Sequence, residues 1–91
     1  MIKSFKHKGL AELFSKGRTA KIDARMHERI IRRLEALDNA KGPENLNLPG
    51  FDFHSLRGDP RRYSIHVNGP WCITFEFEDG DAYRANYEQY H

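Results

Sequence analysis

Residues 63–77 read YSIHVNGPWCITFEF, and this stretch decides the fold. Apolar side chains alternate with polar ones on both sides of Asn68-Gly69-Pro70, which is the period of a half-buried β-strand. The three central residues are turn formers. We therefore predict two antiparallel strands joined by this turn, in the register that pairs Val67 with Trp71, Ile65 with Ile73 and His66 with Cys72.

The same alternation returns at residues 83–87, after Glu78-Asp79-Gly80. A two-residue Asp79-Gly80 turn would pair Phe77 with Ala82 and set the apolar positions of one strand against polar positions of the next. A three-residue loop with a bulge at Gly80 avoids this conflict. We therefore predict the longer loop, with the pairs Phe75–Tyr83, Ile73–Ala85, Trp71–Tyr87, Cys72–Asn86 and Thr74–Arg84.

Two helices are predicted upstream of the strands. Leu10, Leu13 and Phe14 recur at helical spacing before Gly17, which favours a helix end. Asp23 is a good N-cap for a second helix, whose apolar stripe is formed by Met26, Ile30, Leu34 and Leu37. Ile2 and Phe5 are expected to form an edge strand, and residues 41–53, rich in proline and glycine, a loop.

These elements predict one α+β domain over residues 1–91, with two N-terminal helices packed on one face of a small, mainly antiparallel twisted sheet. Each helix has one apolar stripe to bury, so both should cover the face of Trp71 and Phe75. The opposite face should then be polar and open. Strict alternation assigns it the side chains of Ser64, His66, Cys72, Thr74, Arg84, Asn86 and Tyr90.

Composition excludes several classes of protein. The chain has 91 residues and a single cysteine, which excludes an intrachain disulfide framework and fits a reducing compartment. Five histidines lack the spacing of metal ligands, so we expect neither a metal nor a cofactor. No apolar run has the length of a signal peptide or a membrane span, which predicts a cytoplasmic protein with no membrane contact.

The distribution of charge is more informative than its sum, which is only +2. Arg84 is the one cation in the last 20 residues, whereas the rest of the chain is rich in lysine and arginine. Four arginines lie off the apolar stripe of the second predicted helix, where they form either a solvated face or a contact with a partner. They are Arg25, Arg29, Arg32 and Arg33.

The end of the chain places aromatic rings beside an imidazole, at Tyr87, Tyr90 and His91. Cleavage of RNA through its 2′-hydroxyl needs groups that take and give a proton near neutral pH, cations around the phosphate, and aromatic faces that hold unstacked bases. Arg57, Arg61 and Arg62 precede the sheet and can supply the cations. A competing hypothesis is nucleophilic catalysis by Cys72, activated by His66 across the strand pair.

Several segments in order resemble the HigB toxins of the RelE-like group. They are IKSFKHKGL at 2–10, LRGD at 56–59, VNGPW at 67–71, GDAY at 80–83 and YEQYH at 87–91, and together they span nearly the whole chain. The resemblance implies a RelE-like fold and a toxin that binds the A site of the 30S subunit in the 70S ribosome and cuts mRNA there without a metal. It also implies a HigA-like helix-turn-helix antitoxin, through which alone the toxin reaches operator DNA.

The resemblance also implies roles for individual residues. His91 matches the C-terminal acid or base of the family, and Tyr90 matches the tyrosine beside it. Arg57 falls where the family has a basic residue that contacts phosphate, and His54 falls on a second polar position of the same segment. We expect further RNA contacts from side chains of the opening segment, the turn and the polar face, namely Lys6, Lys8, Arg61, Arg62, His66 and Asn68.

The chain departs from the family at Cys72, where many members have an arginine that stabilises the transition-state phosphate. Loss of one such group commonly costs on the order of 10²- to 10³-fold in rate. Either Arg84 supplies the cation from the same face, or the change to cysteine weakens the toxin. The rival functions are a ParE-like toxin directed at gyrase and a non-catalytic module that binds RNA or protein.

Overall fold

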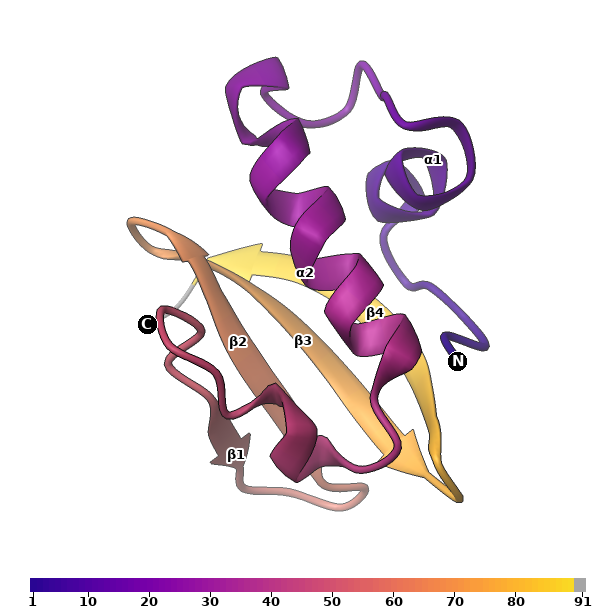
Figure 1. Ribbon diagram of the computed structural model, residues 1–91, viewed down its shortest axis with the longest axis vertical. Coiled ribbons are helices and arrows are strands. Elements are labelled where there is room, and N and C mark those ends of the chain that lie inside the picture. Colours follow the sequence, from indigo (N-terminus) through magenta and orange to yellow (C-terminus); the bar gives the residue numbers. More distant parts are fainter. Residues whose placement is uncertain (90–91) are drawn as a thin grey trace.

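The computed structural model describes residues 1–89 and shows two helices packed on one face of an antiparallel sheet (Figure 1). The sheet has the strand order β1-β2-β3-β4. The predicted α+β architecture is thereby confirmed. In chain order the elements are α1 (Lys8–Lys16), α2 (His27–Asn39), β1 (His54–Leu56), β2 (Arg62–Asn68), β3 (Trp71–Glu78) and β4 (Asp81–Gln89).

The helix ends follow the signals in the sequence. Gly17 ends α1 in the left-handed conformation, with φ 80°, and its N–H donates to the carbonyl of Leu13. The carboxylate of Asp23 accepts the backbone N–H of Arg25 at 2.9 Å and so caps a 3₁₀ turn, Ala24–Met26, that leads directly into α2. Both predicted helices are confirmed.

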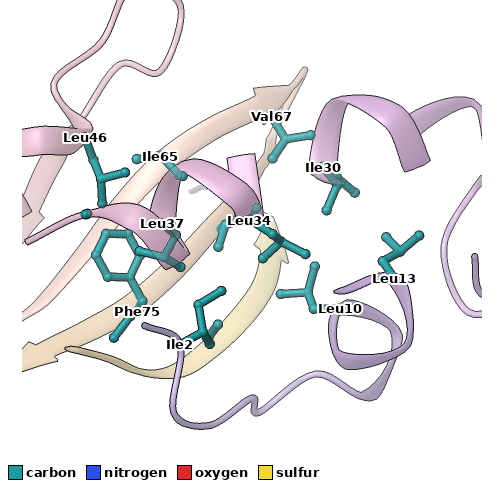
Figure 2. Packing of buried hydrophobic residues seen from close by; sticks show 14 of the residues in the cluster. Ile2, Leu10, Leu13, Ile30, Leu34, Leu37, Leu46, Ile65, Val67 and Phe75 are labelled. Atoms are coloured by element: carbon teal, nitrogen blue, oxygen red, sulfur yellow. The ribbon is translucent and has the colours of Figure 1, made fainter. Parts of the chain in front are cut away.

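The core lies between the helices and the sheet (Figure 2). Side chains from α1 and α2 meet those of β2 and β3 there, and all of them are fully or almost fully buried: Leu10, Leu13, Ile30, Leu34, Leu37, Ile65, Ile73 and Phe75. Leu46 joins them from a 3₁₀ turn, Pro43–Leu46, so the segment predicted as a loop contributes to the core. Ile2 and Phe5 form two isolated parallel bridges to β4, so this segment lies at the sheet edge but is not the strand that we predicted.

The register between β3 and β4 differs from our prediction. The turn is the two-residue Asp79-Gly80 turn, because Glu78 pairs with Asp81 and Phe77 with Ala82. The conflict with the apolar pattern is removed by a β-bulge further along, where β4 has Arg84 and Ala85 against one residue of β3. The predicted three-residue loop and its pairs were therefore wrong.

The bulge explains which side chains of β4 are buried. The extra residue brings both Ala82 and Ala85 to the core, where neither is exposed, and it moves Tyr83 opposite Glu76 on the other face. Arg84 takes the left-handed conformation with φ 52°, and its exposed side chain lies 3.6 Å from the carboxylate of Glu76. Arg84 therefore does not pair with Thr74, which faces Asn86 instead.

The register between β2 and β3 agrees with the prediction over most of its length. Ile65 pairs with Ile73 and His66 with Cys72. The exception is at the turn, where an irregularity at Val67 places Asn68 rather than Val67 opposite Trp71. The alternation of both strands therefore sends Ser64, His66, Cys72 and Thr74 to the face away from the helices, as predicted.

Strand β1 is the element that the sequence did not indicate. It has only three residues and pairs with β2, placing His54 opposite Ser64 and Leu56 opposite Arg62. The ring of Phe53, just before it, stacks on Tyr63 with the centroids 5.8 Å apart. This pairing brings His54 onto the same face of the sheet as His66 and Cys72.

The bulge can be tested by placing glycine at Arg84. A left-handed conformation costs a residue with a Cβ about 1–2 kcal/mol, and glycine adds about 0.5–1 kcal/mol of backbone entropy to the unfolded state. Arg84→Gly should therefore leave the free energy of unfolding in urea unchanged or raise it slightly. Asn86→Gly, in the regular ladder, should lower it by at least about 0.5 kcal/mol. Equal losses for the two variants would contradict the bulge.

Candidate functional site

The outer face of the sheet contains a hollow of about 320 Å³. We call it the outer hollow, and it is lined by Asp52, His54, Ser64, His66, Gly69, Pro70 and Cys72. The pairs His54–Ser64 and His66–Cys72 bring these side chains together from β1, β2 and β3. Ser64 and Cys72 are buried, whereas His54 is exposed and His66 half-buried. The centre of this face is thus less open than predicted.

Both imidazoles at the outer hollow have a defined partner. The Nε2 atom of His54 lies 3.2 Å from a carboxylate oxygen of Asp52. The Nε2 atom of His66 lies 3.1 Å from the carbonyl oxygen of Gly69, to which it can donate a hydrogen bond. Two imidazoles, a type of side chain that serves as acid or base in many enzymes, therefore border the same hollow.

Cys72 is not set up as a nucleophile. Burial raises the pKa of its thiol, the nearby carboxylate of Glu88 raises it further, and the guanidinium of Arg62 only partly opposes this. The thiol therefore stays protonated at neutral pH, and the thiolate is the reactive form of cysteine. The hypothesis of nucleophilic catalysis by Cys72 finds no support in this geometry.

The side chain of Arg62 reaches Glu88, the β4 residue that is paired with Cys72. Its Nη1 atom is 2.9 Å from Glu88, and the hydroxyl of Thr74 donates to the same carboxylate oxygen. Glu88 pairs with Cys72 across the strands, so the network spans β2, β3 and β4 next to the outer hollow. Burial raises the pKa of Glu88, but the hydrogen bonds from Thr74 and Arg62 outweigh it and leave the pKa below its usual value. The carboxylate is ionised and fixes the guanidinium in place.

The other predicted RNA-binding and catalytic residues are spread over the molecule. Arg57 and Arg61 are exposed in the segment between β1 and β2. Arg84 and Lys6 border a separate depression beside the β4 bulge, at the sheet edge opposite β1, and Lys8 begins α1. The predicted placement of Arg84 beside Cys72 is therefore wrong. Tyr90 and His91 lie outside the described residues.

Asn68 lies at a second groove, on the helix side of the sheet. The groove has a volume of about 580 Å³ and contains the stacked rings of Trp71 and Tyr87, whose centroids are 4.6 Å apart. The amide of Asn68 contacts the sulfur of Met26 at 3.5 Å. This places Asn68 away from the imidazoles of the outer hollow.

The four arginines of α2 and of the 3₁₀ turn before it are held by the protein itself. Arg25 pairs with Asp23, and Arg32 forms an ion pair with Glu28, one helical turn away. Arg29 and Arg33 donate instead to backbone carbonyls of β2, at Val67 and His66 respectively. The face is therefore partly structural rather than only solvated.

Sequence reasoning missed Asp52 and Glu88. Asp52 belongs to a segment without periodicity, where nothing in the sequence showed that its carboxylate would reach His54. Glu88 continues the polar alternation of Asn86 and could have been included, had the last strand been extended. Among residues 1–89, no three histidine, cysteine or acidic side chains are placed to hold a metal ion. No helix in that part of the chain is long and apolar enough to cross a membrane.

Comparison with known proteins gives two full-length similarities. The sequence model of HigB-like toxins, described as "RelE-like toxin of type II toxin-antitoxin system HigB", matches residues 3–91. The chain is also 51% identical over 92 residues to the endoribonuclease HigB of Proteus vulgaris, an alignment that covers 100% of both chains.

The raised pKa of Cys72 predicts its rate of alkylation. The rate of modification by iodoacetamide, followed by mass spectrometry, should still be rising with pH above pH 9, because the thiolate forms only there. Glu88→Gln should move the midpoint of this rise to lower pH, since the carboxylate no longer disfavours the thiolate. Glu78→Gln, at the exposed β3–β4 turn, is the control and should leave the midpoint in place. A plateau below pH 8 in the unaltered chain would contradict the account.

Proposed function

Because the chain belongs to the HigB-like family of RelE-like toxins of type II toxin-antitoxin systems, we propose that it is an endoribonuclease that cuts mRNA in the ribosomal A site. The observation that carries this proposal is the outer hollow, which two imidazoles line, together with the neighbouring guanidinium of Arg62, which is held by Glu88 on the same side of the sheet. The name of the Proteus vulgaris relative, an endoribonuclease, supports the reaction type.

The proposed reaction is attack of a ribose 2′-oxygen on the adjacent phosphorus. The O2′–P bond forms and the P–O5′ bond breaks, which leaves a 2′,3′-cyclic phosphate and a 5′-hydroxyl. One protein group takes the proton of the 2′-hydroxyl, and a second gives a proton to the departing 5′-oxygen. His54 and His91 are our candidates for these two roles, and Tyr90 is a third candidate. Each step uses groups of the protein and the RNA, so no metal or cofactor is required.

Charge builds up on the phosphate oxygens in the transition state, and fixed cations stabilise it. Arg62 is the candidate for this role, since its guanidinium is held by Glu88 beside Cys72. It thus takes the place that the family gives to an arginine at position 72. Arg57 and Arg61 are exposed in the segment that leads into β2. Their proposed role is to contact neighbouring phosphates of the RNA.

Partners follow from the type of system. A type II toxin is neutralised by a protein antitoxin, and we propose a HigA-like helix-turn-helix protein that also carries the toxin to operator DNA. The 70S ribosome presents the mRNA. The side chains that line the outer hollow include no phenylalanine, tyrosine or tryptophan on which a base could stack, which fits a substrate that the ribosome itself holds in place.

Induction of the chain in bacterial cells tests the function directly. Growth should stop, and the 5′ ends of mRNA fragments should fall in a fixed phase with respect to codons, because the ribosome sets the position of the cut. His91→Ala should abolish both effects. Growth arrest with intact mRNA would contradict the proposal and favour a toxin directed at gyrase.

A pair of arginine variants tests the origin of the cation. Arg62→Ala should lower the rate of mRNA cleavage on purified ribosomes by about 10²- to 10³-fold, the usual cost of one preorganised charge. Arg84→Ala should change it by less than about threefold, since Arg84 lies beside Glu76 at the bulge. The reverse order of effects would show that Arg84 supplies the cation.

Restoring an arginine at position 72 addresses the activity of the chain itself. Cys72→Arg should raise toxicity sharply if the cysteine weakens the enzyme. Unchanged toxicity would show that Arg62 fully compensates for the missing side chain. Growth curves at graded induction levels measure the difference.

A further inference from the structure

We propose that Asp52 is a positioning residue for His54, which rests on the proposed function. In this role its carboxylate, which lies 3.2 Å from Nε2 of His54, holds the hydrogen on that nitrogen, so that Nδ1 is left to take the proton of the 2′-hydroxyl. The negative charge of Asp52 then stabilises the imidazolium that forms. This arrangement makes His54 the base of the reaction, and the 5′-oxygen receives its proton from another group.

The contact itself is the first observation. One Asp52 carboxylate oxygen lies 3.2 Å from Nε2 of His54, and both residues line the outer hollow. The side chains are 71% and 48% exposed, respectively. An ion pair this exposed contributes only about 0–1 kcal/mol to stability. The pair therefore adds little to the stability of the fold, and its loss should leave the fold intact.

The segment that carries Asp52 is held by contacts far along the chain. Arg33 of α2 makes two hydrogen bonds to backbone carbonyls. Its Nε donates to the carbonyl of His66 at 2.5 Å, and its Nη2 donates to the carbonyl of Gly50 at 3.2 Å. Its guanidinium also lies over the ring of Phe51, 4.7 Å from the centroid. A helix on the core side thereby fixes a loop at the outer hollow.

The aromatic residues on either side of Asp52 set the direction of its side chain. Phe51 and Phe53 both pack against the core, and the carbonyl of Phe51 accepts the backbone N–H of His66 at 2.6 Å. Asp52 lies between them with φ 45°, in the left-handed region. Its side chain is thus turned away from the core toward His54. Aspartate and asparagine tolerate this conformation better than most residues do.

Among the titratable side chains that line the outer hollow, His54 is the one on which Asp52 can act. The other titratable side chains that face the outer hollow are His66 from β2 and Cys72 from β3. His66 is bonded to the carbonyl of Gly69, and the thiol of Cys72 is neutral and buried. A carboxylate that fixes the tautomer of an imidazole and stabilises its cation commonly raises the rate of proton transfer by orders of magnitude.

The test compares single-turnover cleavage of mRNA on ribosomes by the unaltered chain and by Asp52→Asn. Asparagine keeps the left-handed backbone and the size of the side chain but removes the charge. We expect the maximal rate to fall about 10- to 100-fold while the half-saturating toxin concentration does not rise, because a negative charge near RNA has been removed. Asp52→Gly, which adopts φ 45° without strain, should lose at least as much. Glu35→Gln, an exposed change on α2, should match the unaltered chain.

A double-variant cycle separates positioning from a general structural effect. If Asp52 acts through His54, Asp52→Asn should cause no further loss in a chain that already carries His54→Gln. An equal loss in that background overturns the inference, as does a maximal rate for Asp52→Asn within twofold of the unaltered chain. A change in the half-saturating toxin concentration alone also overturns the inference, because Asp52 would then affect only the binding of RNA through its charge. Cleavage by the unaltered chain is the control for the proposed function. If the unaltered chain does not cut mRNA on ribosomes, the proposed function fails; if it cuts and Asp52→Asn cuts equally fast, only the role of Asp52 fails.

Discussion

One-sided burial of the sheet is the constraint on which the rest of the structure depends. The helices cover only one face, and Ile65, Ile73 and Phe75 must all reach it, since each is fully buried there. Because side chains alternate, their neighbours Ser64, His66, Cys72 and Thr74 can only lie on the other face. A shift of one residue would exchange the two sets. The packing of the core thus places the candidate chemistry.

The sequence predicts the structure where its apolar and polar residues follow a regular period. The helices and the pairing of β2 with β3 were predictable, because long apolar patterns leave one register that buries them. The β3–β4 register was not, since a parity argument assumes an unbroken ladder and Arg84 interrupts it with a bulge. The site at Asp52 was not predictable either. Its segment has no period of its own and is fixed by Arg33 from α2 and by the rings of the flanking Phe51 and Phe53, which pack against the core.

The corrected register changes the reading of the site. It removes Arg84 from the neighbourhood of Cys72 and places Glu88 there, which holds Arg62 in turn. The cysteine that departs from the family pattern is therefore accompanied by a guanidinium from the adjacent strand. Under the proposed function, this member of the HigB-like family uses Arg62 where the resemblance implies an arginine at position 72, with no rearrangement of the sheet. The acid–base groups and the cation then share the outer face.

The central claim is that the scissile phosphate binds in the outer hollow. The most direct measurement is a cryo-electron microscopy map of the His91→Ala chain on a ribosome whose mRNA carries a 2′-O-methyl group at the cleavage position. The account predicts the scissile phosphate within hydrogen-bonding distance of Arg62, with the 2′-oxygen facing Nδ1 of His54. A phosphate bound instead between Lys6 and Arg84, beside the β4 bulge, would contradict it.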